Sequence, residues 1–235
     1  MKHTFLIKDW LSSFLSLLFP RCCVVCGRPL AKGEECICTV CNINLPRTNY
    51  HLRKDNPVER LFWGQIPLER ATSFFFYRKG SDFRQILHQL KYGGRKGIGA
   101  IMGRYMASEL LASGFFQGID VIIPVPLHKK KQQIRGYNQS EWIARGITAV
   151  TGIPVDTEMI VRRKNTETQT HKSVFERWEN VDGIFELHHV GALAGKHILL
   201  VDDVLTTGAT TAACAACLAE IEGIHISILT LAIAE

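Results

Sequence analysis

The chain has 235 residues, of which 46% are hydrophobic and 21% charged, and its formal net charge is +6 at pH 7. This apolar content supports a packed core and excludes wholesale disorder, and the length suits one α/β domain with a small appendage. The mild positive charge fits anionic small molecules or nucleic acid and selects neither class of ligand.

The first predicted element is an amphipathic helix that ends at Pro20. The apolar residues on one face of this helix are Trp10, Leu11, Phe14, Leu15 and Leu18. Its apolar run is too short to cross a bilayer, and Pro20 and Arg21 stand where a signal peptide would have its small-residue cleavage site. We therefore expect the helix to pack on the body of the protein, and we expect the protein in the cytoplasm.

Six cysteines cluster between Cys22 and Cys41, and four of them form two CxxC pairs. Each pair can wrap one side of a tetrahedral zinc ion, and the following residues, Gly27 and Asn42, tolerate the left-handed turn that a zinc knuckle often needs. We predict a structural zinc site, in which Cys22 or Cys36 could replace a neighbour. The predicted ligands are Cys23, Cys26, Cys38 and Cys41.

Two other interpretations of the cysteines stay open, a cluster of free thiols and a module with two disulfides. The lack of an export signal counts against disulfides. A third CxxC, Cys214 and Cys217, lies in an alanine-rich helix, where small residues three apart favour helix packing over redox chemistry.

Strands alternate with helices after a polar segment, 51–71, that resembles a linker. The predicted strands are 72–77, 118–126, 153–161, 183–187, 196–203 and 225–234. The predicted helices are 81–92, 98–112, 138–152 and 209–222. This order predicts an α/β fold with a mostly parallel central sheet flanked by helices. The predicted division is a helix and zinc-binding module at 1–50, the linker at 51–71 and the main domain at 72–235.

Two adjacent carboxylates, Asp202 and Asp203, end the apolar strand that begins at His197. Ligands of open α/β sheets bind outside the carboxyl ends of strands. The next loop opens a helix, where backbone N–H groups and the helix dipole favour a phosphate group. Two carboxylates beside a phosphate site could accept hydrogen bonds from two vicinal hydroxyls. A phosphate site next to a site for vicinal hydroxyls predicts a ribose 5-phosphate as the ligand. The loop residues are Thr206, Thr207, Gly208, Ala209 and Thr210.

Two rival interpretations of this strand and loop fail. A Walker B strand requires a G-x-x-x-x-G-K-[ST] loop elsewhere. The nearest stretch, 191–197, is one residue short between its glycines, has His197 where Ser or Thr belongs, and leads into a strand. A sheet edge with a threonine-rich helix cap would leave the two aspartates unexplained.

The run from Ile198 to Thr210, with four apolar residues, two acids and then T-T-G-x-T, resembles the signature by which type I phosphoribosyltransferases bind 5-phosphoribosyl 1-pyrophosphate (PRPP). Together with 124–144, 162–185 and the cysteine module, it makes nearly the whole chain resemble the ComF family. These are amidophosphoribosyltransferase-like proteins associated with natural competence and DNA utilisation. The resemblance implies a type I phosphoribosyltransferase fold and transfer or removal of a phosphoribosyl group.

The resemblance also implies roles for individual residues. The Thr-Gly loop would hold the 5-phosphate, while Asp202 and Asp203 would contact the ribose hydroxyls and stabilise positive charge developing on the ring. Mg²⁺ would bridge pyrophosphate and ribose oxygens. Residues implied in a pyrophosphate loop after an earlier strand are Lys129, Lys130 and Arg135. Residues implied in a mobile lid are Arg162, Arg163, Lys164, Gln169 and Arg177.

The acceptor of the phosphoribosyl group stays open. A hood built from 72–115 would read it, and four aromatic residues there either stack on a base or belong to the core: Tyr77, Tyr92, Phe115 and Phe116. A second hypothesis makes the chain a non-catalytic PRPP sensor, or a module that binds single-stranded DNA or a competence helicase during DNA uptake. The basic stretches 128–135 and 161–165 motivate the DNA-binding form of this hypothesis.

Overall fold

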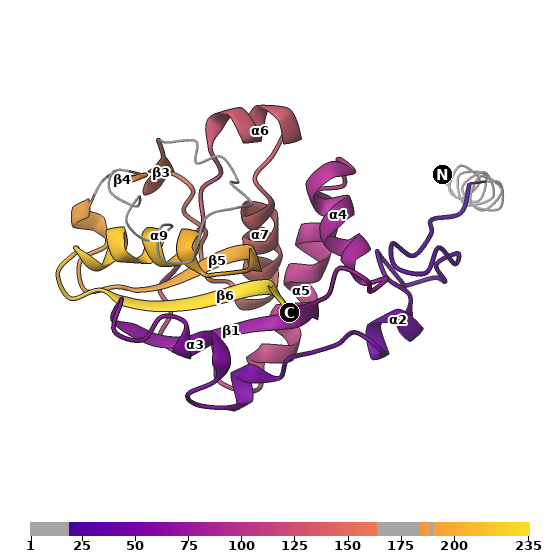
Figure 1. The fold of residues 1–235 in the computed structure, drawn as a ribbon, viewed down its shortest axis with the longest axis horizontal. Coiled ribbons are helices and arrows are strands. Elements are labelled where there is room, and N and C mark those ends of the chain that lie inside the picture. The colour runs from indigo at the N-terminus through magenta and orange to yellow at the C-terminus, as the bar shows by residue number, and fades with distance from the viewer. Residues whose placement is uncertain (1–18, 164–183, 189) are drawn as a thin grey trace, which may run out of the picture.

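The computed structural model describes residues 19–163, 184–188 and 190–235 (Figure 1). Its centre is a four-stranded sheet in which every pair of neighbouring strands is parallel. In sheet order the strands are β1 (Leu68–Tyr77), β6 (His225–Ala234), β5 (His197–Leu205) and β2 (Val121–Pro124). A separate antiparallel hairpin pairs β3 (Ile160–Arg162) with β4 (Phe185–Leu187). The predicted α/β class with a parallel sheet is confirmed.

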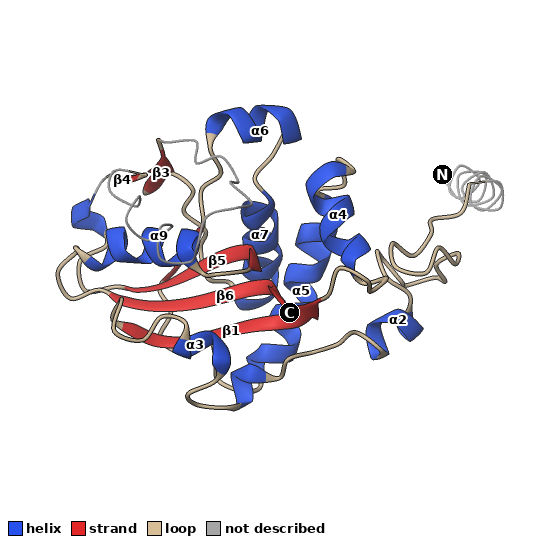
Figure 2. Cartoon of the chain, viewed as in Figure 1, coloured by secondary structure: helices blue, strands red, loops and turns tan. Residues whose placement is uncertain are grey.

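Helices cover both faces of the sheet (Figure 2). One face packs against α4, α5 and α7, and the other against α3 and α9. The helices of the main body are α3 (Pro57–Arg60), α4 (Arg84–Tyr92), α5 (Gly97–Leu111), α6 (Lys129–Arg135), α7 (Gln139–Thr151) and α9 (Ala209–Ala219). The shorter pieces are α2 (Thr39–Ile43) in the cysteine module and two 3₁₀ turns, η1 (Tyr50–Leu52) and η2 (Val190–Ala192).

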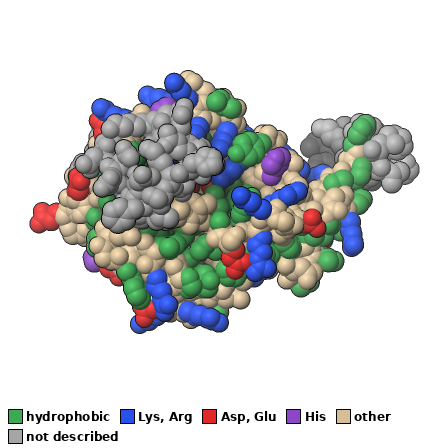
Figure 3. Space-filling view, viewed as in Figure 1, with side chains coloured by type: hydrophobic (Ala, Val, Ile, Leu, Met, Phe, Trp, Pro, Cys, Tyr) green, Lys and Arg blue, Asp and Glu red, His purple; other side chains and the backbone are tan. Residues whose placement is uncertain are grey.

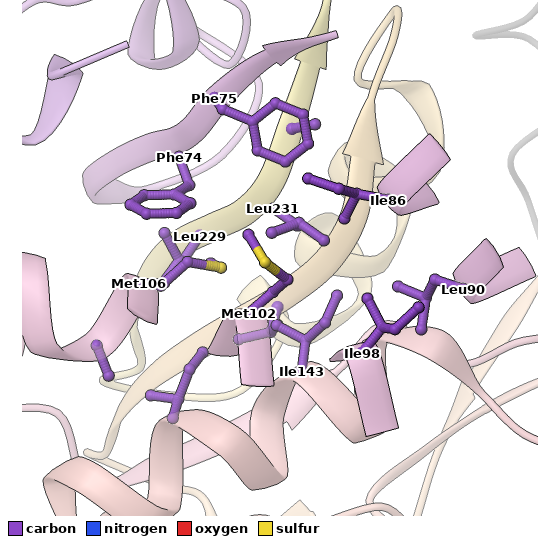
Figure 4. Close-up of a cluster of buried hydrophobic side chains, with 14 of the residues drawn as sticks. Phe74, Phe75, Ile86, Leu90, Ile98, Met102, Met106, Ile143, Leu229 and Leu231 are labelled. Carbon is purple, nitrogen blue, oxygen red and sulfur yellow. The ribbon is translucent and has the colours of Figure 1, made fainter. Parts of the chain in front are cut away.

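β5 is buried on both of its faces, as a continuous apolar run predicts for a central parallel strand. Leu199 and Val201 belong to the core on the α5 side, whereas Ile198 and Leu200 belong to the core on the α9 side. Figure 4 shows how side chains from β1, β6, α4, α5 and α7 fill the first of these cores. This double burial fixes the position of the carboxyl end of β5.

The helices α5 and α7 cross at two glycines. A Cβ added to Gly103 would overlap the carbonyl oxygen of Ile143, and one added to Gly146 would overlap the carbonyl oxygen of Ala100. Backbone therefore meets backbone at the crossing, so that the start of α7 reaches the carboxyl edge of the sheet.

The predicted strand 153–161 is in fact two separate pieces. Val155 makes an isolated parallel bridge to Ile122, and β3 begins only at Ile160. Between them the Asp156 carboxylate accepts hydrogen bonds from the N–H groups of Glu158 and Met159, which turns the chain away from the sheet.

The segment 51–71 contains more structure than a linker would. It includes α3, whose capping box is formed by Asn56 and Glu59, and the first residues of β1. Val58 and Phe62 are fully buried against the sheet. The helix is short and offers few apolar residues among many charged ones, so the sequence of this segment resembles a polar linker.

The predicted N-terminal helix lies in residues 1–18, outside the described part of the chain. Within the described ranges, no helix has both the length and the apolar character needed to cross a membrane.

Candidate functional site

The four cysteines of the two CxxC pairs come together in space. Their Sγ atoms all lie within 4.8 Å of one another, so the cluster could hold a metal ion. Gly27 is left-handed, with φ 73°, and its N–H donates to the Cys23 carbonyl, as a knuckle turn requires. Asn42 instead lies in α2, where the second pair places the Cys41 N–H on the Cys38 sulfur.

Metal binds the thiolate form of cysteine, and in the cluster the surroundings favour this form at Cys23, whereas burial and the neighbouring cysteines raise the pKa of Cys41. Burial would raise the pKa of Cys23, but hydrogen bonds from the backbone N–H groups of Cys26, Cys38 and Val25 outweigh it and lower the pKa to about 7. The N–H of Cys38 lies 3.3 Å from the Cys23 sulfur. Donors that are already directed at a sulfur reduce the cost of deprotonating it.

The other cysteines take no part in the cluster. Cys36 is buried beside Met102, and burial raises the pKa of its thiol to about 12. Cys22 is exposed, and all eight cysteines are free thiols, so neither a spare ligand nor a disulfide appears among them. Cys214 is fully buried inside α9, which agrees with the packing role predicted for it.

The cysteine module is joined to α5 by ion pairs. Arg47 bonds Glu109 at 2.6 Å, and Glu35 pairs with Arg104. The module cysteines also share one hydrophobic core with the sheet. The module is therefore packed as a part of the main body.

The two aspartates lie where the sheet opens at its carboxyl edge. β2 pairs with β5 only as far as Val201, and the next residues of β5 are Asp202 and Asp203. β5 itself continues to Leu205 along β6, two residues beyond its predicted end. Because side chains alternate along a strand, the two carboxylates point to opposite faces of the sheet.

Asp202 is held by two hydroxyls from two helices. Its carboxylate accepts a hydrogen bond from Ser140 in the first turn of α7 at 3.0 Å, and one from Thr211 in α9 at 3.2 Å. Burial, followed by the negative charge of Asp203, raises the pKa of Asp202 to about 6. Ser140 was not predicted, although its place two residues after the N-cap Asn138 points it toward this edge.

Asp203 has an ionic partner that the sequence did not reveal. Lys91 of α4 places its Nζ 3.1 Å from an Asp203 carboxylate oxygen, and both side chains are mostly buried. The two residues are far apart along the chain, and only the packing of α4 on the sheet brings them together. No local pattern in the sequence predicts such a pair.

The predicted phosphate loop turns directly into α9. Gly208 is the N-cap of that helix, in the left-handed conformation with φ 78°, and packs near the Phe62 ring. Thr206 and Thr210 are exposed, whereas Thr207 and Ala209 are half-buried. Only a glycine accepts this φ without strain, so the turn that opens the loop toward solvent depends on Gly208.

The predicted basic loop after β2 forms the helix α6. Lys129 and Lys130 on this helix are exposed, whereas Lys131 and Arg135, four residues apart, share one partly buried face. Burial, and then the positive charges of Arg162, Arg135 and Lys91, lower the pKa of Lys131. In Figure 3, Lys and Arg side chains lie along the top of the molecule, where α6 lies, and at other places on the same face. Lys131 was missed because the segment was read as a loop.

Two of the five predicted lid residues are described. Arg162 ends β3, its guanidinium stacks over Phe185, and burial lowers its pKa while Asp202 acts in the opposite direction. Arg163 is exposed and pairs with Glu186. The other three lie outside the described residues, namely Lys164, Gln169 and Arg177.

The four aromatic candidates for a base-binding hood divide into residues of the core and one exposed residue. Phe115 and Phe116 are buried in the core, and Tyr77 packs against it. Tyr92 is 69% exposed, and the Arg135 guanidinium lies over its ring at 5.6 Å. Of the four, Tyr92 is thus the one whose ring is exposed.

A cavity of about 650 Å³ lies at the opposite, amino edge of the sheet. Two polar side chains of its walls have partners within the protein: Arg70 donates to the carbonyls of Gly114 and Phe115, and Glu69 bonds His225. Asp202 and Asp203 do not line this cavity. The hydrogen bonds of Arg70 connect β1 to the residues that follow α5.

Comparison with known proteins identifies relatives that match most of the chain. It is 31% identical over 211 residues to the DNA utilization protein YhgH of Shigella flexneri, which covers 83% of this chain and 89% of that protein. It is 27% identical over 215 residues to the competence protein ComFC of Bacillus subtilis, which covers 90% of this chain and 83% of that protein. No protein-family profile matches the chain.

Among solved structures, the chain is similar to the glutamine PRPP amidotransferase of Bacillus subtilis complexed with ADP and GMP, with a TM-score of 0.36 and 23% identity. That match covers 57% of this chain and 26% of the other, so the chain spans about a quarter of the solved structure. A similarity this low says nothing about activity. The match to the DNA utilization and competence proteins does extend over most of both chains, and the chain belongs to their family, the ComF family.

Proposed function

We propose that this protein binds PRPP with Mg²⁺ at the carboxyl edge of its sheet and transfers or removes the phosphoribosyl group. The observation that carries the proposal is the meeting of three kinds of group at one edge. These are the acid pair on β5, the Thr-Gly turn that opens α9, and the inward-facing cations of α6 and β3. A ribose carrying a 5-phosphate and a 1-pyrophosphate has a matching group for each.

Each group has a distinct task in this proposal. Backbone N–H groups at the start of α9, with the hydroxyls of Thr206 and Thr207, hold the 5-phosphate. Asp202 and Asp203 accept hydrogen bonds from the ribose hydroxyls and stabilise positive charge on the ring as the bond to pyrophosphate lengthens. Lys131 and Arg135 receive the departing pyrophosphate. Carboxylate oxygens are the ligands that Mg²⁺ prefers, and the ion would neutralise charge on the leaving group.

We also propose that the four-cysteine cluster holds zinc in a structural role. Four thiolates complete a tetrahedral coordination sphere and leave no position for a substrate. The names of the relatives further suggest a part in competence or DNA utilisation. We propose that the protein acts there from the cytoplasm.

The Thr207→Ala variant is expected to bind Mg²⁺-PRPP about 10- to 100-fold more weakly than the wild type, because a hydroxyl that donates to a charged phosphate contributes roughly 1.5–3 kcal/mol. Calorimetric titration of the zinc-loaded protein measures this. Thr148→Ala, in the far half of α7, is the matched control and should bind as the wild type does. Absence of any saturable PRPP binding by the wild type would refute the proposed function.

A second candidate function is binding of single-stranded DNA, alone or while docked to a helicase. It is favoured by the exposed Lys129 and Lys130 on α6 and by the exposed Tyr92 ring, over which Arg135 of the same helix lies. Cationic side chains and an exposed aromatic ring suit a nucleic-acid strand.

Removing both lysines, in Lys129→Gln with Lys130→Gln, is expected to weaken binding of an oligothymidylate and to reduce its salt dependence. Each lost phosphate contact lowers the slope of log affinity against log salt by about 0.7 for single strands. Fluorescence anisotropy at several salt concentrations measures the slope. A slope that stays the same, or no binding at low salt, would exclude α6 as the DNA-binding surface.

A further inference from the structure

Lys91 forms an ion pair that is shielded from solvent. Its Nζ lies 3.1 Å from Asp203, and the exposed fractions of the two side chains are 20% and 11%. Salt and water screen such a pair weakly, and loss of either partner leaves a charge that is costly to keep. In the described structure, therefore, the charge of Asp203 is already balanced by the protein.

The backbone beside Lys91 is anchored independently of this pair. The Tyr137 hydroxyl donates to the Leu90 carbonyl at 2.6 Å, and Leu90 itself is fully buried. Tyr137 stands immediately before the N-cap of α7. The same turn that presents Ser140 to Asp202 thus also fixes the end of α4, and the Lys91 side chain can change partner while its backbone stays in place.

Lys91 also lies close to other cations. Burial, and then the positive charges of Arg162, Arg135 and Lys91, lower the pKa of Lys131. The Lys91 ammonium thus bonds one aspartate of the acid pair and also repels a cation of α6. A lysine on a flexible stem can turn from a carboxylate to a phosphate oxygen by rotating its side chain alone.

We propose that Lys91 is the resident counter-ion of Asp203, and that it exchanges Asp203 for a phosphate oxygen when a metal–pyrophosphate ligand binds. The exchange rests on the proposed PRPP site. A free metal ion meets an aspartate that is already neutralised and must compete with the ammonium. A metal ion that is bound to a polyphosphate brings an anion with it, and the Lys91 ammonium can leave Asp203 to bind a phosphate oxygen of that anion. Lys91 thereby makes the site select the metal–phosphate complex over the free ion.

Mn²⁺ is a suitable probe, because it accepts the same oxygen ligands as Mg²⁺ and its free concentration is measured by electron paramagnetic resonance. The zinc-loaded protein is titrated with Mn²⁺ alone, and then with Mn²⁺ and PRPP together. The variants are Lys91→Gln, which removes the charge, and Lys91→Arg, which keeps it. The matched control is Lys196→Gln, an exposed lysine at the opposite end of β5.

Lys91→Gln is expected to bind Mn²⁺ alone about tenfold more tightly than the wild type and Mn²⁺-PRPP about tenfold more weakly. Lys91→Arg should keep the wild-type preference for the complex. If Lys91 only stabilised the fold, Lys91→Gln would lower the affinity for Mn²⁺ alone as well as the affinity for Mn²⁺-PRPP. The double variant Lys91→Gln with Asp203→Asn should lose the gain in Mn²⁺ affinity, because the gain depends on Asp203.

Two results of the titrations with Mn²⁺ alone would overturn the exchange. One is equal affinity of the wild type and Lys91→Gln for Mn²⁺ alone, and the other is a gain that persists in the double variant. If the wild type binds Mn²⁺-PRPP and Lys91→Gln binds it equally well, the exchange fails and the PRPP site stands. If the wild type does not bind Mn²⁺-PRPP, the proposed function fails and the exchange fails with it.

Discussion

The Asp202→Asn variant is expected to bind Mg²⁺-PRPP at least ~100-fold more weakly than the wild type at pH 7.5, because the ligand loses a charged hydrogen-bond acceptor. The amide oxygen can still accept a hydrogen bond from one of the two hydroxyls, Ser140 or Thr211, and the amide NH2 can donate to the oxygen of the other, so the change tests charge more than shape. Calorimetric titration gives the affinity. Retention of wild-type affinity would remove Asp202 from the proposed site.

The pH dependence of the same binding gives an independent test. Burial and the neighbouring Asp203 raise the pKa of Asp202 to about 6, so its charged form is lost as the pH falls through 6. The wild-type affinity should then fall about tenfold per pH unit below that value. Phosphate groups of the ligand also titrate near pH 6. Because the ligand is the same for both proteins, the difference between the wild type and Asp202→Asn isolates the aspartate.

The free energy of unfolding should change with pH in the direction opposite to the affinity for PRPP. The folded-state pKa of Asp202, about 6, lies above its ordinary value of 3.8, so the folded state holds the proton more tightly than the unfolded chain. The free energy of unfolding of the ligand-free protein therefore falls as the pH rises from about 4 to 6, by roughly 1–3 kcal/mol. Asp202→Asn removes this cost and should melt at a higher temperature than the wild type at pH 7. A lower melting temperature would indicate damage to the fold and contradict the electrostatic argument.

The Gly103→Ala variant is expected to lose about 3 kcal/mol or more of folding free energy, and Gly146→Ala a similar amount. At each position the added methyl group would overlap a backbone carbonyl oxygen of the opposite helix. A side chain could rotate away from such a contact, but a helix backbone cannot. The helices α5 and α7 would have to separate, and Ser140 would move away from Asp202. Chemical denaturation measures the loss, with soluble yield as a first indication.

Gly97→Ala is the matched control for this prediction. Gly97 begins the same helix, α5, and an added Cβ there has no neighbour within 4 Å. Alanine should leave stability unchanged or raise it slightly, because it favours a helix over glycine. If Gly103→Ala and Gly97→Ala melt alike, the helix crossing is looser than its geometry indicates.

Local signals in the sequence predicted much of this fold. The apolar run of β5, the glycine that ends α7 at Gly152 and the paired cysteines each carry their structure within a few neighbouring residues. The predicted helices 81–92 and 98–112 correspond to α4 and α5 with ends shifted by three residues or fewer. The roles proposed for the loop and lid residues remain predictions.

Features that depend on distant contacts, or on the direction of a single side chain, were not predicted from the sequence. Lys91 is one of many surface-type lysines until α4 packs over β5 and brings it to Asp203. Lys131 follows two exposed lysines, and only the helical turn of α6 distinguishes its direction from theirs. Asp156 looks like any polar residue in a strand, and its side chain breaks that strand by bonding the backbone ahead of it.

The pairing of β1 with β6 has a consequence for how the protein is made. The register joins Leu68–Tyr77 to His225–Ala234, so β1 leaves the ribosome long before its only strand neighbour in the described sheet exists. At typical rates of synthesis the wait is on the order of ten seconds. Throughout it, the apolar run of Phe74 and Phe75 has no sheet to join. The order of translation thus leaves the nascent chain in need of protection from aggregation until β6 emerges.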